Sequence, residues 1–220
     1  LSYYHRSVSD YDCVIIGEAD NVPLEHALRY FENGEMELMF TFDHMRADCI
    51  GTDFIRRRFS VKKFKRALSA WQNGLAGRAW NALYLENHDH ARVISRYGSE
   101  RYRVESGKAL AAAYMLLQGT PFIYQGQEIG MTNLRLPSAD MYPDVQTRGM
   151  VKAASRWLSP RRVLRLTQDA ARDSARTPMQ WTSGKNAGFT EGEPWFFVNE
   201  NARTVNVEAE DADEDSLLNF

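Results

Sequence analysis

The sequence predicts an α/β fold built on a parallel sheet, and two observations lead to this prediction. Four short apolar segments alternate with longer segments whose apolar residues recur at helical spacing, with a period of roughly 30 to 40 residues. Each apolar segment is followed at once by polar residues. Strands that alternate with helices in this way form units whose strands lie parallel.

Each expected element follows from a local pattern. The predicted strands are residues 11–16, 37–42, 80–86 and 120–124, and the predicted helices between them are residues 23–31, 61–76 and 104–117. Pro23 suits the first turn of a helix, Ser60 is a favoured N-cap, and Gly119 ends the third helix. Two polar helices, 140–157 and 160–171, and the start of a further helix at 213–220 follow. Four such strand–helix units are half of an eight-stranded (β/α)8 barrel.

Polar side chains gather directly after the third predicted strand. Asn87, His88, Asp89, His90 and Arg92 lie within one short stretch. In α/β barrels the loops after the strands converge at one face, and that face carries the chemistry. The first predicted strand ends in the same way, because a glutamate at position 18 follows its apolar residues. The sequence therefore predicts a functional site at the carboxyl edge of the sheet.

Composition and charge exclude several classes of protein. The 220 residues are 44% hydrophobic, which is enough for one sizeable core, and the formal net charge of -2 gives no reason to expect a nucleic-acid partner. The basic runs are expected to be solvated helix faces. We find no secretory signal and no apolar run of transmembrane length, so we expect no membrane partner and a cytoplasmic location. Cys13 is expected to be buried in the first strand, and two cysteines do not make a disulfide framework.

Five motifs together resemble glycoside hydrolase family 13, the α-amylase family, in its oligo-1,6-glucosidase and α-glucosidase branch. They are GEAD (17–20), NHDHARVISRYG (87–98), GTPFIYQGQEIGMTN (119–133), SARTPMQW (174–181) and AGFTEGEPWFFVN (187–199). The resemblance implies that residues 1–220 are a partial catalytic domain, the second half (strands five to eight) of a (β/α)8 TIM barrel. Both ends look cut, and the family's first four strands and its C-terminal β-sandwich are expected to be absent.

The same resemblance implies roles for two carboxylates. Glu18 matches the general acid/base and Asp89 matches the carboxylate that stabilises the transition state. The nucleophilic aspartate is expected upstream of Leu1. Retaining glycoside hydrolysis uses one carboxylate to attack the sugar and one carboxylic acid to protonate the leaving oxygen, about 5 to 5.5 Å apart. Partial burial of Glu18 at a strand end would favour its protonated form.

The resemblance also implies substrate contacts. His88 matches a histidine that donates hydrogen bonds to the terminal glucose, and Arg176 matches an arginine that holds the same glucose. Arg92 and Glu128 are expected to line the same mouth. No cofactor is expected. A metal site is disfavoured, because His88-Asp89-His90 lacks the helical spacing of a zinc motif. The expected core tryptophans are Trp71, Trp80 and Trp181, whereas the loop residue Phe189 is placed to stack on sugar.

Three functions stay open at this point. The first is an α-glucosidase that hydrolyses α-1,6 or α-1,4 bonds of short oligosaccharides. The second is a sucrose isomerase or glucosyltransferase, which shares the whole catalytic set. The third is a non-catalytic barrel scaffold, which the presence of Glu18, His88 and Asp89 disfavours. Alone, the chain is expected to be inactive. Its edge strands and its uncovered inner sheet face predict association with a second copy or with the missing half-barrel.

Overall fold

The computed structural model describes residues 6–8 and 10–220, without the side chains of residues 52–54. The chain forms two compact units, each built from separate stretches of sequence. The first comprises Leu1–Cys49, Arg57–Tyr84 and Ala113–Phe122, and the second comprises Ile50–Arg56, Leu85–Ala112 and Ile123–Phe220. The first unit contains the main sheet, and the second contains the long connections that follow its last two strands.

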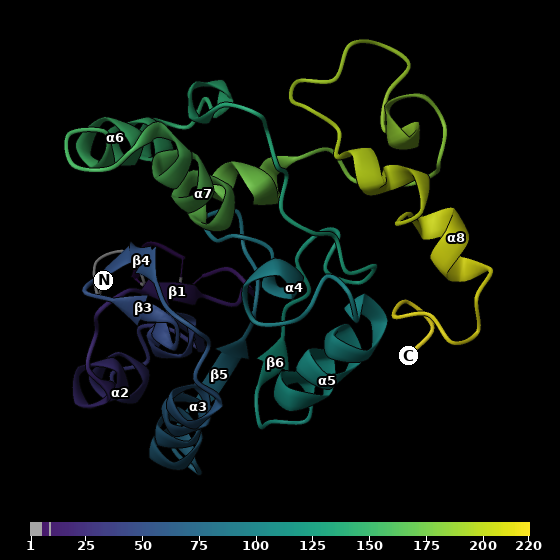
Figure 1. The fold of residues 1–220 in the computed structure, drawn as a ribbon. Coiled ribbons are helices and arrows are strands. Elements are labelled where there is room, and N and C mark those ends of the chain that lie inside the picture. The colour runs from purple at the N-terminus through teal and green to yellow at the C-terminus, as the bar shows by residue number, and fades with distance from the viewer. Residues whose placement is uncertain (1–5, 9) are drawn as a thin grey trace. The chain divides into compact units, whose positions relative to one another are not determined.

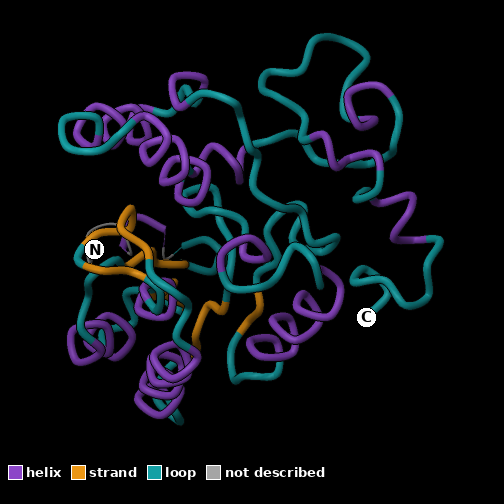
Figure 2. Tube along the Cα trace, viewed as in Figure 1, coloured by secondary structure: helices purple, strands orange, loops and turns teal. Residues whose placement is uncertain are grey.

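The first unit is organised around a four-stranded parallel sheet with the order β1-β2-β5-β6. Figure 1 labels β1, β5 and β6, and Figure 2 draws the strands in orange. Its strands are β1 (Ile16–Ala19), β2 (Leu38–Thr41), β5 (Trp80–Leu83) and β6 (Thr120–Pro121). Gly17 pairs with Met39, and Met39 pairs in turn with Asn81, so these three residues share one face. The predicted parallel α/β architecture is confirmed.

Helices α2 (Leu24–Glu32) and α3 (Val61–Leu75) pack on the sheet face that carries Met39. They form a core with the sheet through Ala27, Leu28, Met36, Met39, Trp71 and Leu75. Ser60 caps α3 as expected, because its side chain accepts a hydrogen bond from the Lys63 N–H at 3.3 Å. Trp71 is 4% exposed, and its indole N–H donates to Asp43 at 2.8 Å.

The first strand lies further along the chain than predicted. Residues 11–15 are not in a strand, Cys13 is exposed, and Glu18 lies inside β1 rather than after it. The apolar run starting at Cys13 suits a strand, but the parallel ladder with β2 begins only at Ile16 and Leu38. Without a partner strand, the earlier residues do not become a strand.

The fourth strand, β6, is shorter than the predicted residues 120–124: it ends at Pro121, although the Phe122 N–H still donates to the Leu83 carbonyl of β5 at 2.7 Å. Gly119 shapes the entry to this strand. Its φ is 149°, and a Cβ at this position would lie 2.6 Å from the carbonyl oxygen of Asn81. Only glycine fits such a close approach of two backbones.

The connections outside the sheet contain several short elements. These are α4 (Val93–Arg96), α5 (Arg103–Met115), α6 (Val145–Ala154), α7 (Pro160–Ala170), α8 (Val207–Asp211) and the short strands β3 (Cys49–Ile50) and β4 (Thr52–Arg56). The two polar helices predicted at 140–157 and 160–171 are present as α6 and α7. The prediction of a helix at 213–220 is wrong, because these residues form turns. The Asn219 amide there donates to three carbonyls, of Glu210, Asp211 and Asp213, which holds this segment in turns. The described helices include none with the length and hydrophobicity that a membrane crossing requires.

Candidate active site

A buried ion pair holds the loops of the second unit together. Arg92 is completely buried, and its Nη1 lies 3.0 Å from the Glu86 carboxylate. The same guanidinium donates to the carbonyl of Gln125 at 2.6 Å and to the carbonyl of Ser174 at 3.3 Å. Glu86 also accepts a hydrogen bond from the Val93 N–H at 2.7 Å, at the start of α4. One side chain thus connects the segment after β5, the segment after β6 and the later segment around Ser174.

Burial raises the pKa of the Glu86 carboxyl above its ordinary value, and the neighbouring Arg92 opposes this rise without cancelling it. The charge of Glu128 adds to the rise. Gly126 is required beside this pair. Its φ is 86°, and a Cβ there would overlap the Met131 sulfur and lie 3.2 Å from Arg92 Nη1.

The expectation that Arg92 lines the mouth of the site is wrong. Its side chain is 0% exposed, and its donors are already taken by Glu86 and by two backbone carbonyls. A guanidinium enclosed in this way cannot reach a substrate. Arg92 supports the loops that carry the exposed polar residues.

Four charged side chains form a closed ring in the second unit. We call Asp89, Arg172, Asp144 and Arg176 the four-charge ring. Asp89 Oδ1 lies 2.8 Å from Arg172 Nη1 and 2.8 Å from Arg176 Nη2. Asp144 contacts the same two arginines: its Oδ1 lies 2.8 Å from Arg172 Nε, and its Oδ2 lies 3.0 Å from Arg176 Nη1. Each carboxylate therefore bridges both guanidiniums.

The loop around Asp89 is fixed by further bonds. The Asp89 N–H donates to the Asn87 side chain at 2.8 Å, and Arg176 Nε donates to the His88 carbonyl at 2.9 Å. His88 Nε2 lies 3.7 Å from Asp89 Oδ2, and its side chain is 58% exposed. In the described part of the chain, Oδ2 has no closer polar partner. Asp89 thus has one oxygen held by two arginines and one oxygen open beside an exposed imidazole.

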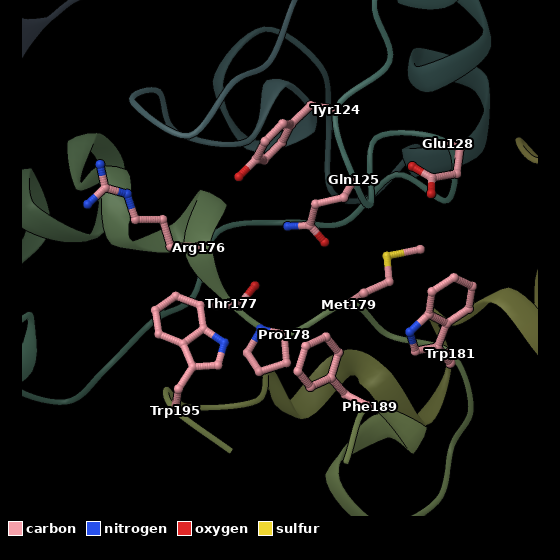
Figure 3. Close-up of a pocket in the computed structure, with 10 residues that line it drawn as sticks. All are labelled: Tyr124, Gln125, Glu128, Arg176, Thr177, Pro178, Met179, Trp181, Phe189 and Trp195. Carbon is pink, nitrogen blue, oxygen red and sulfur yellow. The ribbon is translucent and has the colours of Figure 1, made fainter.

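The predicted residues Arg176 and Glu128 both line a pocket of about 380 Å³ in the second unit. The pocket is lined by Tyr124, Gln125, Glu128, Arg176, Thr177, Pro178, Met179, Trp181, Phe189 and Trp195 (Figure 3). Figure 3 shows Arg176 and Glu128 at opposite ends, with the Phe189 and Trp195 rings between them on one side. The Oε2 of Glu128 is buried, and no described residue forms a hydrogen bond with it. The pocket thus combines aromatic faces, a cation and an acceptor oxygen, which suits a polyhydroxylated ring.

Two of the three expected core tryptophans are not in a core. Trp181 is 48% exposed and lines the pocket, and Trp80 is 45% exposed on the sheet, whereas Trp71 is buried as expected. Phe189, expected to be available for stacking, is 43% exposed and lines the same pocket. Trp195, which the sequence reasoning did not single out, is 65% exposed beside it.

Glu18 lies in the first unit, near the end of β1. Its cross-strand neighbours are Phe40 and then Ala82, so it points to the face opposite the one that α2 and α3 cover. The side chain is exposed, because neither α2 nor α3 packs over this face. This exposure contradicts the partial burial expected of Glu18. Asp89 belongs to the other unit, so the approach of Glu18 to Asp89 stays a prediction.

Sequence reasoning missed Asp144 and Arg172. Arg172 and Arg176 are the first and last residues of a short 3-10 helix, whose three-residue turn does not place positions four apart on one side, so their spacing gave no signal. Asp144 precedes α6 as its N-cap and accepts hydrogen bonds from the Gln146 and Thr147 N–H groups. An N-cap aspartate looks structural in a sequence. Among the described residues, no group of three or more His, Cys, Asp or Glu side chains is placed to hold a metal ion.

Replacing Arg92 by methionine is expected to lower the free energy of unfolding by about 3–5 kcal/mol, because Glu86 is left buried without its counter-charge. Urea denaturation followed by tryptophan fluorescence measures this. The double variant Arg92→Met/Glu86→Gln keeps an acceptor for the Val93 N–H but has no buried charge, so it should recover part of the loss. A single variant within about 1 kcal/mol of the wild type would contradict the structural role.

Asp144→Asn is expected to lower the free energy of unfolding at neutral pH by about 1–3 kcal/mol, because the hydrogen bonds to charged partners weaken while the N-cap is kept. Burial acts to raise the pKa of Asp144, but hydrogen bonds from Arg172 and Thr147 outweigh it, so the pKa lies below its ordinary value of 3.8. The native carboxyl thus binds its proton more weakly than the unfolded one. The Asp144 contribution is therefore complete well above pH 3.8 and is lost as the pH falls through the native pKa.

Denaturation curves of wild type and Asp144→Asn from pH 7 to pH 2.5 measure this difference, which should shrink at the acid end. Asp140→Asn is the matched control, because Asp140 is exposed and forms no ion pair in the part of the chain that the structure describes. A difference between wild type and Asp144→Asn that does not change with pH would show that the Asp144 charge contributes nothing.

Comparison with known proteins places these motifs in a family. The description "Alpha amylase, catalytic domain" matches residues 2–220. An oligo-1,6-glucosidase from Parageobacillus thermoglucosidasius is 41% identical over 227 residues, a match that covers 100% of this chain and 40% of that relative. The chain spans about 40% of the length of the curated relatives it matches.

Solved structures agree with the sequence match. A trehalose-6-phosphate hydrolase from Bacillus licheniformis has a TM-score of 0.90 at 38% identity, over 96% of this chain and 39% of that one. An isomaltulose synthase from Klebsiella sp. LX3 has a TM-score of 0.90 at 34% identity, also over 96% of this chain and 39% of that one. The chain therefore belongs to the α-amylase catalytic-domain family, glycoside hydrolase family 13, as its motifs indicated.

Proposed function

We propose that this chain supplies part of the active site of a retaining α-glucosidase that hydrolyses α-1,6 or α-1,4 bonds of short oligosaccharides. The observation that carries the proposal is the state of Asp89. Two arginines hold its Oδ1, and its Oδ2 is open beside the exposed His88. A fixed carboxylate with one open oxygen is suited to stabilise positive charge that develops on a sugar ring. Membership of the family and the similarity to an oligo-1,6-glucosidase support the assignment.

In this proposal Glu18 is the general acid/base and Asp89 is the transition-state stabiliser. Glu18 protonates the glycosidic oxygen as the bond breaks and then removes a proton from the attacking water. The nucleophilic aspartate comes from a part of the polypeptide outside these residues. The strands β1, β2, β5 and β6 then take the places of barrel strands five to eight, and residues 1–220 are the corresponding part of the catalytic domain.

His88 and Arg176 are proposed to hold the hydroxyls of the terminal glucose. The His88 imidazole is exposed beside Asp89, and the Arg176 guanidinium, whose side chain is 28% exposed, contacts Asp89 and lines the pocket. Glu128 is proposed to contact a hydroxyl because it lines the same pocket, and the rings of Phe189 and Trp195 offer faces on which a sugar can stack. Arg92 is assigned no substrate contact. We propose a reducing cytoplasm as the compartment, since two cysteines at this spacing do not make a disulfide framework.

Two related reactions are alternatives. Isomaltulose synthases and trehalose-6-phosphate hydrolases are similar in structure over nearly the whole chain. An isomerase passes the glucosyl group to another hydroxyl instead of to water, and it needs no change in the roles of Glu18 and Asp89. A phosphorylated disaccharide needs a cationic site for the phosphate in addition. A non-catalytic scaffold is disfavoured, because it would not need the open oxygen of Asp89.

The test is the hydrolysis of isomaltose, maltose, sucrose and trehalose 6-phosphate by the full-length protein that contains these residues. We expect isomaltose or maltose to be cleaved to glucose, and we expect purified residues 1–220 to be inactive because they lack the nucleophile. Glu18→Gln should slow isomaltose hydrolysis by at least about 100-fold, because the proton donor is lost. A glucoside whose leaving group needs no proton should lose much less in the glycosylation step.

Glu25→Gln is the matched control, because Glu25 is an exposed glutamate in the first turn of α2, and its activity should equal that of the wild type. Equal losses for both kinds of leaving group in Glu18→Gln would exclude the acid role. Turnover of sucrose to an isomer, without hydrolysis of isomaltose, would favour the isomerase. No turnover of any of the four sugars would exclude both reactions.

A further inference from the structure

We propose that Arg172 and Asp144 are positioning residues for this reaction, which hold the Asp89 carboxylate and the Arg176 guanidinium in one orientation through the four-charge ring. The inference rests on the proposed function for its effect on turnover. The structural part of the inference is that Arg172, together with Asp144, fixes the orientation of Asp89, and this part rests on the geometry alone.

The ring leaves Asp89 and Arg176 little freedom to rotate. Arg172 contacts the two carboxylates with different nitrogens: Nη1 donates a hydrogen bond to Asp89, and Nε forms an ion pair with Asp144 at 2.8 Å that lacks hydrogen-bond geometry. Arg176 donates hydrogen bonds from Nη2 to Asp89 and from Nη1 to Asp144, and its Nε donates to the His88 carbonyl. A planar guanidinium held at two or three nitrogens has a defined plane, which a lysine in its place would not have.

Asp144 anchors the ring to the fold. Its Oδ1 accepts hydrogen bonds from the Gln146 N–H at 2.9 Å and the Thr147 N–H at 3.1 Å, at the start of α6. Its own N–H donates to the buried carboxylate of Asp173 at 3.0 Å, and Asp173 also accepts from the Thr147 hydroxyl at 2.8 Å. The ring is therefore attached to a helix end and not to a mobile side chain.

Exposure rises across the ring from the anchor to the open carboxylate. The side chain of Asp144 is 6% exposed, those of Arg172 and Arg176 are 24% and 28%, and that of Asp89 is 36%. Asp144 is thus the innermost member and has no surface to offer a sugar. Arg172 presents its donors to two carboxylates, so both residues act through Asp89 and Arg176.

The ring also explains which oxygen of Asp89 is open. Two guanidinium donors occupy Oδ1, so Oδ2 is directed away from the arginines, towards His88. Catalysis by an oriented charge depends on that charge being fixed before the reaction. Without Arg172, Asp89 keeps a single guanidinium contact and can rotate about it. The loss should appear in kcat more than in KM, because Asp89 acts on charge that develops in the transition state.

The kinetic test is a double-mutant cycle in the full-length protein, with rates expressed per active site titrated by a covalent glucosidase inactivator. Arg172→Gln should lower kcat for isomaltose by about 10- to 100-fold, the size expected of a displaced reactive group. In an Asp89→Asn background the same change should have an effect of less than about 2-fold, because Arg172 acts through Asp89. Arg172→Lys should fall between wild type and Arg172→Gln.

Arg135→Gln is the matched control. Arg135 also bridges two carboxylates, Glu100 at 3.0 Å and Asp169 at 3.7 Å, but it has no contact with Asp89. Its loss should leave kcat unchanged. The positioning role is overturned if Arg172→Gln lowers kcat by the same factor with and without the Asp89 carboxylate, or if it has no effect on kcat.

Crystal structures of the full-length wild type and Arg172→Gln supply a readout that does not depend on turnover. We expect the Asp89 carboxylate to rotate or to occupy two conformers in Arg172→Gln, and to stay as in wild type in Arg135→Gln. An unchanged Asp89 in Arg172→Gln overturns the inference. If the wild type hydrolyses none of the four sugars, the proposed function fails, and these structures still decide whether Arg172 positions Asp89.

Discussion

The candidate site depends on one buried ion pair, Arg92 with Glu86. A guanidinium without access to water must place all its donors on protein acceptors, and Arg92 places them on a carboxylate and on the carbonyls of Gln125 and Ser174. Such a pair adds little net stability, since its two charges lose their hydration. Its value is geometric. It brings the segment that carries Asp89 next to the segments that carry Glu128 and Arg176.

The same types of residue serve a different purpose in the four-charge ring. There the carboxylates and guanidiniums alternate, and exposure increases from Asp144 to Asp89. The charges balance inside the ring, so the fold tolerates it, while one oxygen of the outermost carboxylate stays open. The inner members resemble the second layer of ligands around a metal, which orients the first layer without touching the substrate. The pocket beside the ring adds aromatic faces and the buried oxygen of Glu128.

The sequence predicted the parallel sheet, because the alternation of apolar strands and amphipathic helices is a local signal. It predicted a functional site around Asp89 from the motif of residues 87–98. It placed the first strand too early, because only the pairing with β2 decides where the ladder starts. It assigned Arg92 to the mouth and Trp181 to the core, because exposure is set by residues distant in sequence. It missed Arg172 and Asp144 because their roles arise from contacts between residues far apart along the chain: Arg172 lies 83 residues from Asp89, and Asp144 lies 32 residues from Arg176.

The most direct test is a crystal structure of the full-length protein that carries Glu18→Gln, with isomaltose bound. The account predicts that the terminal glucose lies within hydrogen-bond distance of Asp89 Oδ2 and Arg176. It also predicts that the side chain at position 18 contacts the glycosidic oxygen, and that Arg172 and Asp144 keep their contacts without touching the sugar. A sugar bound away from Asp89, or a position 18 remote from the glycosidic oxygen, would contradict it.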